Sequence, residues 1–283
     1  MILVDLNQVM ISNMMMQIGN HKNAQVDENM IRHMILNSLR YNKLKFEQDY
    51  GEMIICADDK NYWRRKYFPY YKALRRTDRE ESELDWNAIF NALNNVREEL
   101  KEIFPYKVIQ IDTAEADDII GTIVHAEGTM LNSDNPILIL SGDKDYIQLH
   151  TYGNVSQYDP TRKRWIKNSD PEGYLHEHIV RGDRGDGVPN ILSPDNCLVL
   201  KQRQGRVTQK RLDESKDINN MSDALKRNYI RNKTLVDLSQ VPEEIKQQVM
   251  DAYRTENTKD RSLLFNYFVK NKLRNLMAHI SEF

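Results

Sequence analysis

Short apolar runs alternate with amphipathic stretches through the first half of the chain. Four runs of mainly aliphatic residues have the length and composition of buried strands. They lie at residues 2–4, 53–56, 108–111 and 137–140. Between them apolar side chains recur at helical spacing. The helices predicted from that spacing cover residues 8–18, 28–44, 86–104 and 113–124. This alternation predicts an α/β fold, with a mostly parallel, doubly wound central sheet and helices on both faces.

The pattern changes in the second half of the chain. Residues 158–161 have the composition of a turn and residues 163–166 that of a short strand, which predicts a hairpin. Beyond about residue 170 the sequence indicates helices and loops, without a convincing buried strand. We therefore expect an α/β core over residues 1–170 and a helical domain over residues 171–283.

Acidic residues follow the expected strands and open the helix predicted at residues 113–124. The carboxyl ends of parallel strands share one edge of a sheet, and open α/β sheets bind ligands there, so these side chains should converge. They are Asp5, Asp58, Glu115, Asp117, Asp118, Asp143 and Asp145. An alternative for the helix alone is that acids stabilise the positive end of its dipole. That alternative does not extend to Asp143 and Asp145.

Such a cluster predicts bound cations. Two carboxylates ~4 Å apart repel by about 4 kcal/mol at an effective dielectric near 20. Oxygen donors select Mg²⁺ or Mn²⁺ over Zn²⁺. The acids exceed what one Mg²⁺ needs, and paired ions suit displacement at a phosphodiester. The alternative is that one or two of these acids are solvated loop ends. His176 and His178 alternate on a predicted helix and point apart, so we expect surface or satisfied histidines there.

Basic residues gather in two regions. Residues 62–79 interleave seven basic residues with six aromatics. We call this stretch the arm, and it forms the centre of a basic arch expected around residues 62–85. This composition is typical of a surface that grips phosphates and stacks on bases, although a charged surface helix is the alternative. Residues 201–236 contain ten lysines and arginines against four acids. Between the two regions, glycines at residues 181–190 let the backbone approach a phosphate, and Asp183 and Asp186 there could add carboxylates.

Taken in order, these motifs resemble the flap-endonuclease family of 5′ nucleases, and most of all its bacteriophage ribonuclease H branch of the T-even type. The resemblance rests on Asp5, on Asp58 before the basic stretch 71–75, and on the acidic motifs at residues 115–118, 141–145 and 182–186. It extends to about residue 190 and weakens beyond. Five motifs in this order are a specific signal, whereas each alone is moderate.

The resemblance implies a 5′-nuclease or PIN-like fold and a Mg²⁺-dependent nuclease with two ions, for which Mn²⁺ may substitute. Its expected metal ligands are Asp5, Asp58, Glu115, Asp117, Asp118, Asp143, Asp145, Asp183 and Asp186. Lys72 and Arg75 resemble the arch residues that act at the scissile phosphate. Residues 176–200 resemble a helix–three-turn–helix that holds duplex backbone.

The expected substrate is a DNA duplex with a 5′ flap or an RNA–DNA hybrid, processed during DNA replication. The expected nucleic-acid contacts are Arg64, Arg65, Lys72, Arg75, Arg79, Arg184, Lys201, Arg203, Arg206, Lys210 and Arg211. Single-stranded-DNA-binding protein or other replication proteins are candidate partners of an expected monomer. Residues 190–196 depart from the family's glycine-rich hairpin, which leaves phosphate or potassium binding there open.

Composition narrows the alternatives. The chain is 40% hydrophobic and 29% charged, and no apolar run approaches the roughly 20 residues of a membrane helix. Two cysteines and the absence of a basic leader at the start favour a cytoplasmic protein, in a phage-infected bacterium by the resemblance. An aspartate-dependent phosphatase would need an acid at Asn7. A binding protein that keeps the fold without catalysis is the remaining alternative.

Overall fold

The computed structural model describes residues 1–18, 27–82, 84–130 and 135–283. Its centre is a six-stranded sheet with strand order β3-β2-β1-β4-β5-β6. The strands are β1 (Ile2–Asp5), β2 (Met53–Cys56), β3 (Lys107–Ile109), β4 (Ile137–Leu140), β5 (Val155–Asp159) and β6 (Arg164–Ile166). Strands β1 to β5 pair in parallel, and β6 is antiparallel to β5. The predicted mostly parallel sheet and the terminal hairpin are confirmed.

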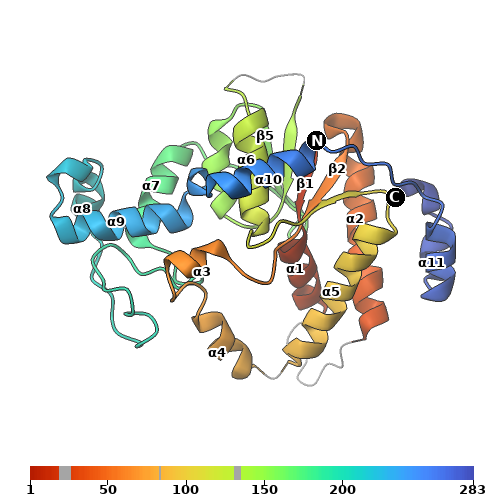
Figure 1. Ribbon diagram of the computed structural model, residues 1–283, viewed down its shortest axis with the longest axis horizontal. Coiled ribbons are helices and arrows are strands. Elements are labelled where there is room, and N and C mark those ends of the chain that lie inside the picture. The colour runs from red at the N-terminus through yellow and green to blue at the C-terminus, as the bar shows by residue number, and fades with distance from the viewer. Residues whose placement is uncertain (19–26, 83, 131–134) are drawn as a thin grey trace.

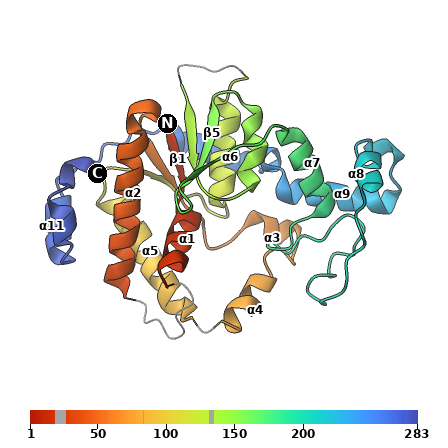
Figure 2. The same cartoon turned by 180° about the vertical axis from the view of Figure 1, so that it is seen from behind.

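Both faces of the sheet are covered by helices (Figures 1 and 2). Ile2 and Val4 pack into one buried cluster and Leu3 into the other, because successive side chains of a strand point to opposite faces. On the first face lie α1 (Leu6–Ile18), α2 (Glu28–Tyr50) and α5 (Trp86–Glu102). On the second face lie α6 (Ala116–Glu127) and α10 (Glu243–Arg254).

The remaining helices lie around this core. They are α3 (Trp63–Tyr67), α4 (Leu74–Glu80), α7 (Pro171–Arg181), α8 (Gln209–Glu214), α9 (Asp223–Val236), α11 (Leu264–Lys270) and α12 (Arg274–Met277). Short 3₁₀ helices occur at Asp145–Thr151, Ile218–Asn220, Leu238–Gln240 and Ile280–Glu282. Residues 182–208, all of them described, contain no helix. Turns cover most of residues 191–201, and the next helix after α7 is α8. None of the helices in the described ranges could cross a membrane.

The end of the chain packs on the α/β core. Phe268 and Phe283 are buried against Phe104 at the end of α5, and α10 packs on α6. Figure 1 shows α8 and α9 at one end of the molecule and α11 at the other. The division near residue 170 stays a prediction. Helix α7 packs against the 3₁₀ helix at Asp145–Thr151, and α8 and α9 lie farther from the sheet (Figure 1).

The strand order creates a switch point. From β1 the chain proceeds to β2 and β3 on one side, and then crosses to β4 and β5 on the other. The loops after β1 and β4 therefore diverge and leave a crevice at their carboxyl ends, the general ligand-binding position of open α/β sheets.

A candidate acidic active site

A cavity of about 290 Å³ opens at this switch point. Lys72 and Arg75 also line it. The carboxylates around it are Asp5, Asp58, Asp117, Asp143, Asp145 and Asp186. They come from the ends of β1, β2 and β4, from the first turn of α6 and from the loop after α7. Six of the nine expected metal ligands therefore converge on one cavity.

Local structure orients the acids at the sheet edge. Asp5 ends β1 and accepts hydrogen bonds from the Tyr146 hydroxyl (3.1 Å) and the Ser141 hydroxyl (3.1 Å). Asp58 accepts one from the Asn7 side chain (2.8 Å) and one from the backbone N–H of Ala116 (2.8 Å) at the start of α6. The dipole alternative assigned the amino terminus of α6 to that helix's own acids. In the structure this terminus also binds Asp58, which follows β2.

Electrostatics in the cavity favour bound cations. Burial, and then the charges of Asp58 and Asp143, raise the pKa of Asp5 to about 7. Burial and neighbouring carboxylates likewise raise the pKa of Asp117 and Asp145 well above its usual range. Keeping these groups ionised together needs compensating positive charge. Clustered carboxylate oxygens fit hard divalent cations such as Mg²⁺ and Mn²⁺.

Two expected ligands point elsewhere. Glu115 and Asp118 are 1% and 0% exposed and pair with the buried guanidinium of Arg64 at 2.9 and 2.7 Å. Asp118 also accepts hydrogen bonds from Trp63 (3.0 Å) and from the backbone N–H of Glu115 (2.9 Å), which closes a capping box at the start of α6. Protein donors engage their oxygens, and neither carboxylate lines the cavity.

Arg64 corrects an expectation about nucleic-acid contacts. Its side chain is 2% exposed and also donates to the Leu235 carbonyl (2.9 Å), so it cannot reach a phosphate at the surface. Burial by itself would raise the pKa of Glu115, but the charges of Lys72 and Arg64 outweigh it and lower that pKa to about 2. Arg64 therefore ties the arm to α6 and α9.

Removing Arg64 should cost stability. Arg64→Ala leaves Asp118 and part of Glu115 as buried charges without their cation, and breaking a buried pair costs about 3–5 kcal/mol. The free energy of unfolding from urea titration measures the loss. The exposed neighbour Arg65 offers a matched control, for which Arg65→Ala should change stability by less than about 0.5 kcal/mol. Equal midpoints for both variants would contradict the role.

The contribution of Glu115 should depend on pH, because its pKa is depressed in the folded protein. The stability that its ion pairs contribute is fully present above the usual glutamate pKa of about 4.3 and is lost as the pH falls toward 2.

Lys72 has a strained backbone conformation, which contacts with the loop after α7 maintain. It has a left-handed conformation (φ 54°), which costs a non-glycine residue on the order of 1 kcal/mol. Its N–H donates to the Asp186 carbonyl (2.7 Å), and Gly187 lies so close that a Cβ there would meet the Tyr70 carbonyl at 2.6 Å. The loop after α7 therefore fixes the arm.

The charges of Lys72 and Arg75 face the cavity acids. The Lys72 ammonium pairs with Glu115 and lies 3.6 Å from Asp186, while Arg75 contacts Asp186 at 2.5 Å. Burial would lower the pKa of Lys72, but Asp186 and Glu115 outweigh it and raise the pKa. Both side chains are therefore cationic at the edge of the cavity.

The arm is less exposed than its composition predicted. Trp63, Phe68 and Tyr71 are buried, and the Tyr71 hydroxyl donates to Asp186 (2.9 Å). These aromatics fill core, so the base-stacking interpretation does not apply to them. Tyr67 remains 47% exposed. Of the other expected contacts, Arg79 and Arg211 are half-buried, and exposed ones are Arg65, Arg75, Arg184, Lys201, Arg203, Arg206 and Lys210.

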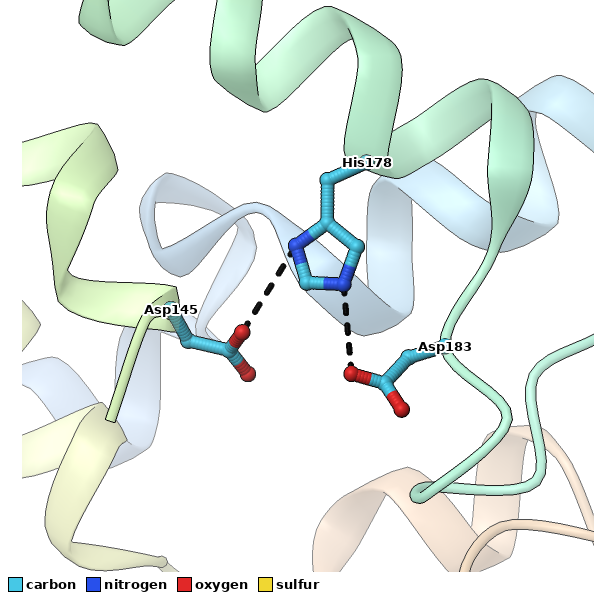
Figure 3. Close-up of side chains that lie close together, drawn as sticks. All are labelled: Asp145, His178 and Asp183. Atoms are coloured by element: carbon cyan, nitrogen blue, oxygen red, sulfur yellow. Dashed lines mark hydrogen bonds and ion pairs between the residues drawn. The ribbon is translucent and has the colours of Figure 1, made fainter. Parts of the chain in front are cut away.

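Sequence reasoning missed His178. Figure 3 shows its ring between Asp145 and Asp183, with Nδ1 3.6 Å from Asp145 and Nε2 3.2 Å from Asp183. His176 does point elsewhere, toward the Leu212 carbonyl (3.0 Å), so the expectation of opposed rings was right. His178 is partnered, in line with the expectation of surface or satisfied histidines, because the loop after α7 brings Asp183 back beside it. Its position next to Asp145 of the acidic cavity was not expected.

Comparison with known proteins gives the class. Residues 1–178 match the family described as "5′-3′ exonuclease, N-terminal resolvase-like domain", and residues 170–283 match "T4 RNase H, C terminal". The parallel sheet with acids at its switch point is thus the fold of a resolvase-like nuclease. The chain belongs to the 5′-3′ exonuclease family.

Two relatives agree with this family, and two solved structures share the fold. A ribonuclease H of Enterobacteria phage T4 is 31% identical over 294 residues, covering 99% of this chain and 95% of the relative. A 5′-3′ exonuclease of Streptomyces coelicolor is 26% identical over 157 residues, covering 49% of this chain and 50% of the relative. A bacteriophage T5 flap endonuclease, in a complex with DNA and metal ions, aligns with TM-score 0.63 and 17% identity, covering 89% of this chain and 97% of that one. A T5 5′-exonuclease with bound zinc aligns with TM-score 0.62 and 17% identity, over 89% and 98% of the two chains.

Proposed function

We propose that this nuclease removes RNA primers or 5′ flaps during DNA replication, hydrolysing phosphodiesters from the 5′ side with two Mg²⁺ ions. The observation that carries the proposal is the set of six carboxylates around one cavity, with Lys72 and Arg75 at its edge. Relatives named ribonuclease H and flap endonuclease support the substrate class. The acting form would be a monomer in the cytoplasm of an infected bacterium.

Each part of the chain has a defined task in this reaction. Bound cations would activate the attacking water and stabilise the leaving oxygen. The ions would be held by the six acids that line the cavity, which are Asp5, Asp58, Asp117, Asp143, Asp145 and Asp186. Lys72 and Arg75 would stabilise charge that develops on the scissile phosphate. The exposed lysine and arginine side chains at residues 201–210 would bind duplex backbone outside the cavity.

Product mapping tests this proposal. The substrates are a 5′-labelled RNA primer on a DNA template and a DNA duplex with a 5′ flap, each with Mg²⁺, with Mn²⁺ or with EDTA. We expect short 5′ products with either ion and none with EDTA. Binding without cleavage under all conditions would instead support the non-catalytic binding protein.

The two-ion arrangement predicts unequal effects at the two positions. Asp186 lies in the outlying loop with Asp183, so Asp186→Asn should lower occupancy at one ion position more than at the other. Its loss also frees Arg75, which now contacts it at 2.5 Å. Anomalous scattering from crystals soaked in Mn²⁺ measures both occupancies. Unchanged occupancy at both positions would remove Asp186 from the ligand set.

A further inference from the structure

His178 has the geometry of a metal-ligating histidine. One ligand atom each from Asp145, His178 and Asp183 lie within 4.8 Å of one another. Ligand atoms on opposite sides of one ion are about 4.2 Å apart at Mg²⁺–oxygen distances. His178 Nδ1 lies 3.6 Å from Asp145, so one cation can contact both atoms while Asp183 stays on the other ring nitrogen.

The two ring nitrogens have different surroundings. Nε2 is hydrogen-bonded to Asp183 at 3.2 Å. Nδ1 is buried and has no hydrogen-bond partner among the described residues, and it faces Asp145 at 3.6 Å. A metal-bound histidine commonly donates its other N–H to a carboxylate, which fixes the tautomer and the ring orientation. The pairing of Nε2 with Asp183 leaves Nδ1 as the nitrogen that can bind a cation.

We propose that His178 Nδ1 is a ligand of a divalent cation shared with Asp145, oriented by Asp183, and that this nitrogen makes the position favour Mn²⁺ over Mg²⁺. The inference rests on the proposed function, because Asp145 also lines the acidic cavity. Mg²⁺ prefers oxygen ligands, whereas imidazole nitrogen binds transition ions more strongly. The competing explanation is an imidazolium that bridges the two carboxylates without touching an ion.

Pulsed electron paramagnetic resonance of Mn²⁺ on the full-length protein separates these explanations. A directly bound imidazole gives a nitrogen modulation, which should change when the histidines carry ¹⁵N. We expect that signal in the unsubstituted protein, its loss in His178→Gln and its retention in His176→Gln. The matched control lies on the same helix with its ring turned toward Leu212. Absence of the signal in the unsubstituted protein, or its persistence in His178→Gln, overturns the proposal.

Affinity supplies the test of selectivity. His178→Gln should weaken Mn²⁺ binding by about tenfold or more, while Mg²⁺ binding falls by less than threefold. Equal losses for both ions would overturn the selectivity. If a variant misfolds, the spectrum of the unsubstituted protein still tests direct coordination of the imidazole.

Cleavage of the labelled substrates with Mg²⁺ is measured separately. Cleavage without nitrogen coupling rejects only this inference, and coupling without cleavage rejects only the nuclease function.

Discussion

Asp143→Asn is expected to lower the single-turnover rate of cleavage by roughly 10³-fold or more. Asp143 lies just after β4 and lines the cavity, where it would hold an ion. A metal ion supplies several kcal/mol of transition-state stabilisation, and each ~1.4 kcal/mol is a factor of ten in rate. Substrate binding should stay equal or improve, because the change removes a negative charge that faces phosphates.

The measurement is cleavage at saturating enzyme beside equilibrium binding of the same flap substrate. Asp112→Asn is a suitable control, because this acid also follows a strand run but is exposed and does not line the cavity. We expect near-normal cleavage from it. Substantial Mg²⁺-dependent cleavage by Asp143→Asn would remove that residue from the site.

The sheet edge was predictable because its signals are local. An apolar run followed by an acid shows where a strand ends, and parallel pairing brings Asp5 and Asp143 together at adjacent strands. Which way a carboxylate points was not predictable. Asp117 and Asp118 are neighbours on α6, yet Asp117 lines the cavity and Asp118 faces Arg64. That choice depends on a partner 54 positions away in sequence.

The arm shows the same limit. Alternating aromatic and basic residues indicate a binding surface, but composition does not reveal that Phe68 and Tyr71 fill a cluster with Ile179 and Val236. His178 was missed because helix periodicity describes one element, whereas Asp145 and Asp183 come from two others. A histidine five residues before an acid in a glycine-rich loop was the available signal.

The basic side chains should fall into two groups: those that act at the reacting phosphate and those that bind backbone phosphates elsewhere. Arg75 is 44% exposed, sits on α4 and reaches Asp186 in the cavity. Charge at that place can stabilise the transition state more than the ground state. Arg203 and Arg206 are exposed and lie in the irregular segment that precedes α8, and Arg211 is half-buried on α8. They line no part of the cavity, and contacts with backbone phosphates there would contribute affinity and salt dependence.

Arg75→Ala or Lys72→Ala should therefore lower single-turnover cleavage at saturating enzyme by ~10²-fold or more, the scale of losing one aligned donor, with little change in binding. Arg75→Ala is the cleaner variant, since Lys72 also pairs with buried Glu115 and its loss can affect folding. Arg76→Ala is its matched control, because Arg76 is exposed beside it and pairs with Glu80 on the same helix at 2.8 Å.

Replacing Arg203, Arg206 and Arg211 together should have the opposite effect. We expect weaker binding, a salt dependence that is shallower by up to about three phosphate contacts, and near-normal cleavage once the enzyme saturates the substrate. Single-turnover rates and salt-dependent binding on one 5′-flap substrate measure both sets of variants. Since a phosphate-gripping residue affects affinity and a residue at the reacting centre affects the saturated rate, the two sets must separate. If both lose affinity alike and cleave normally when saturated, the arm is only another backbone-binding surface and Lys72 and Arg75 have no catalytic role.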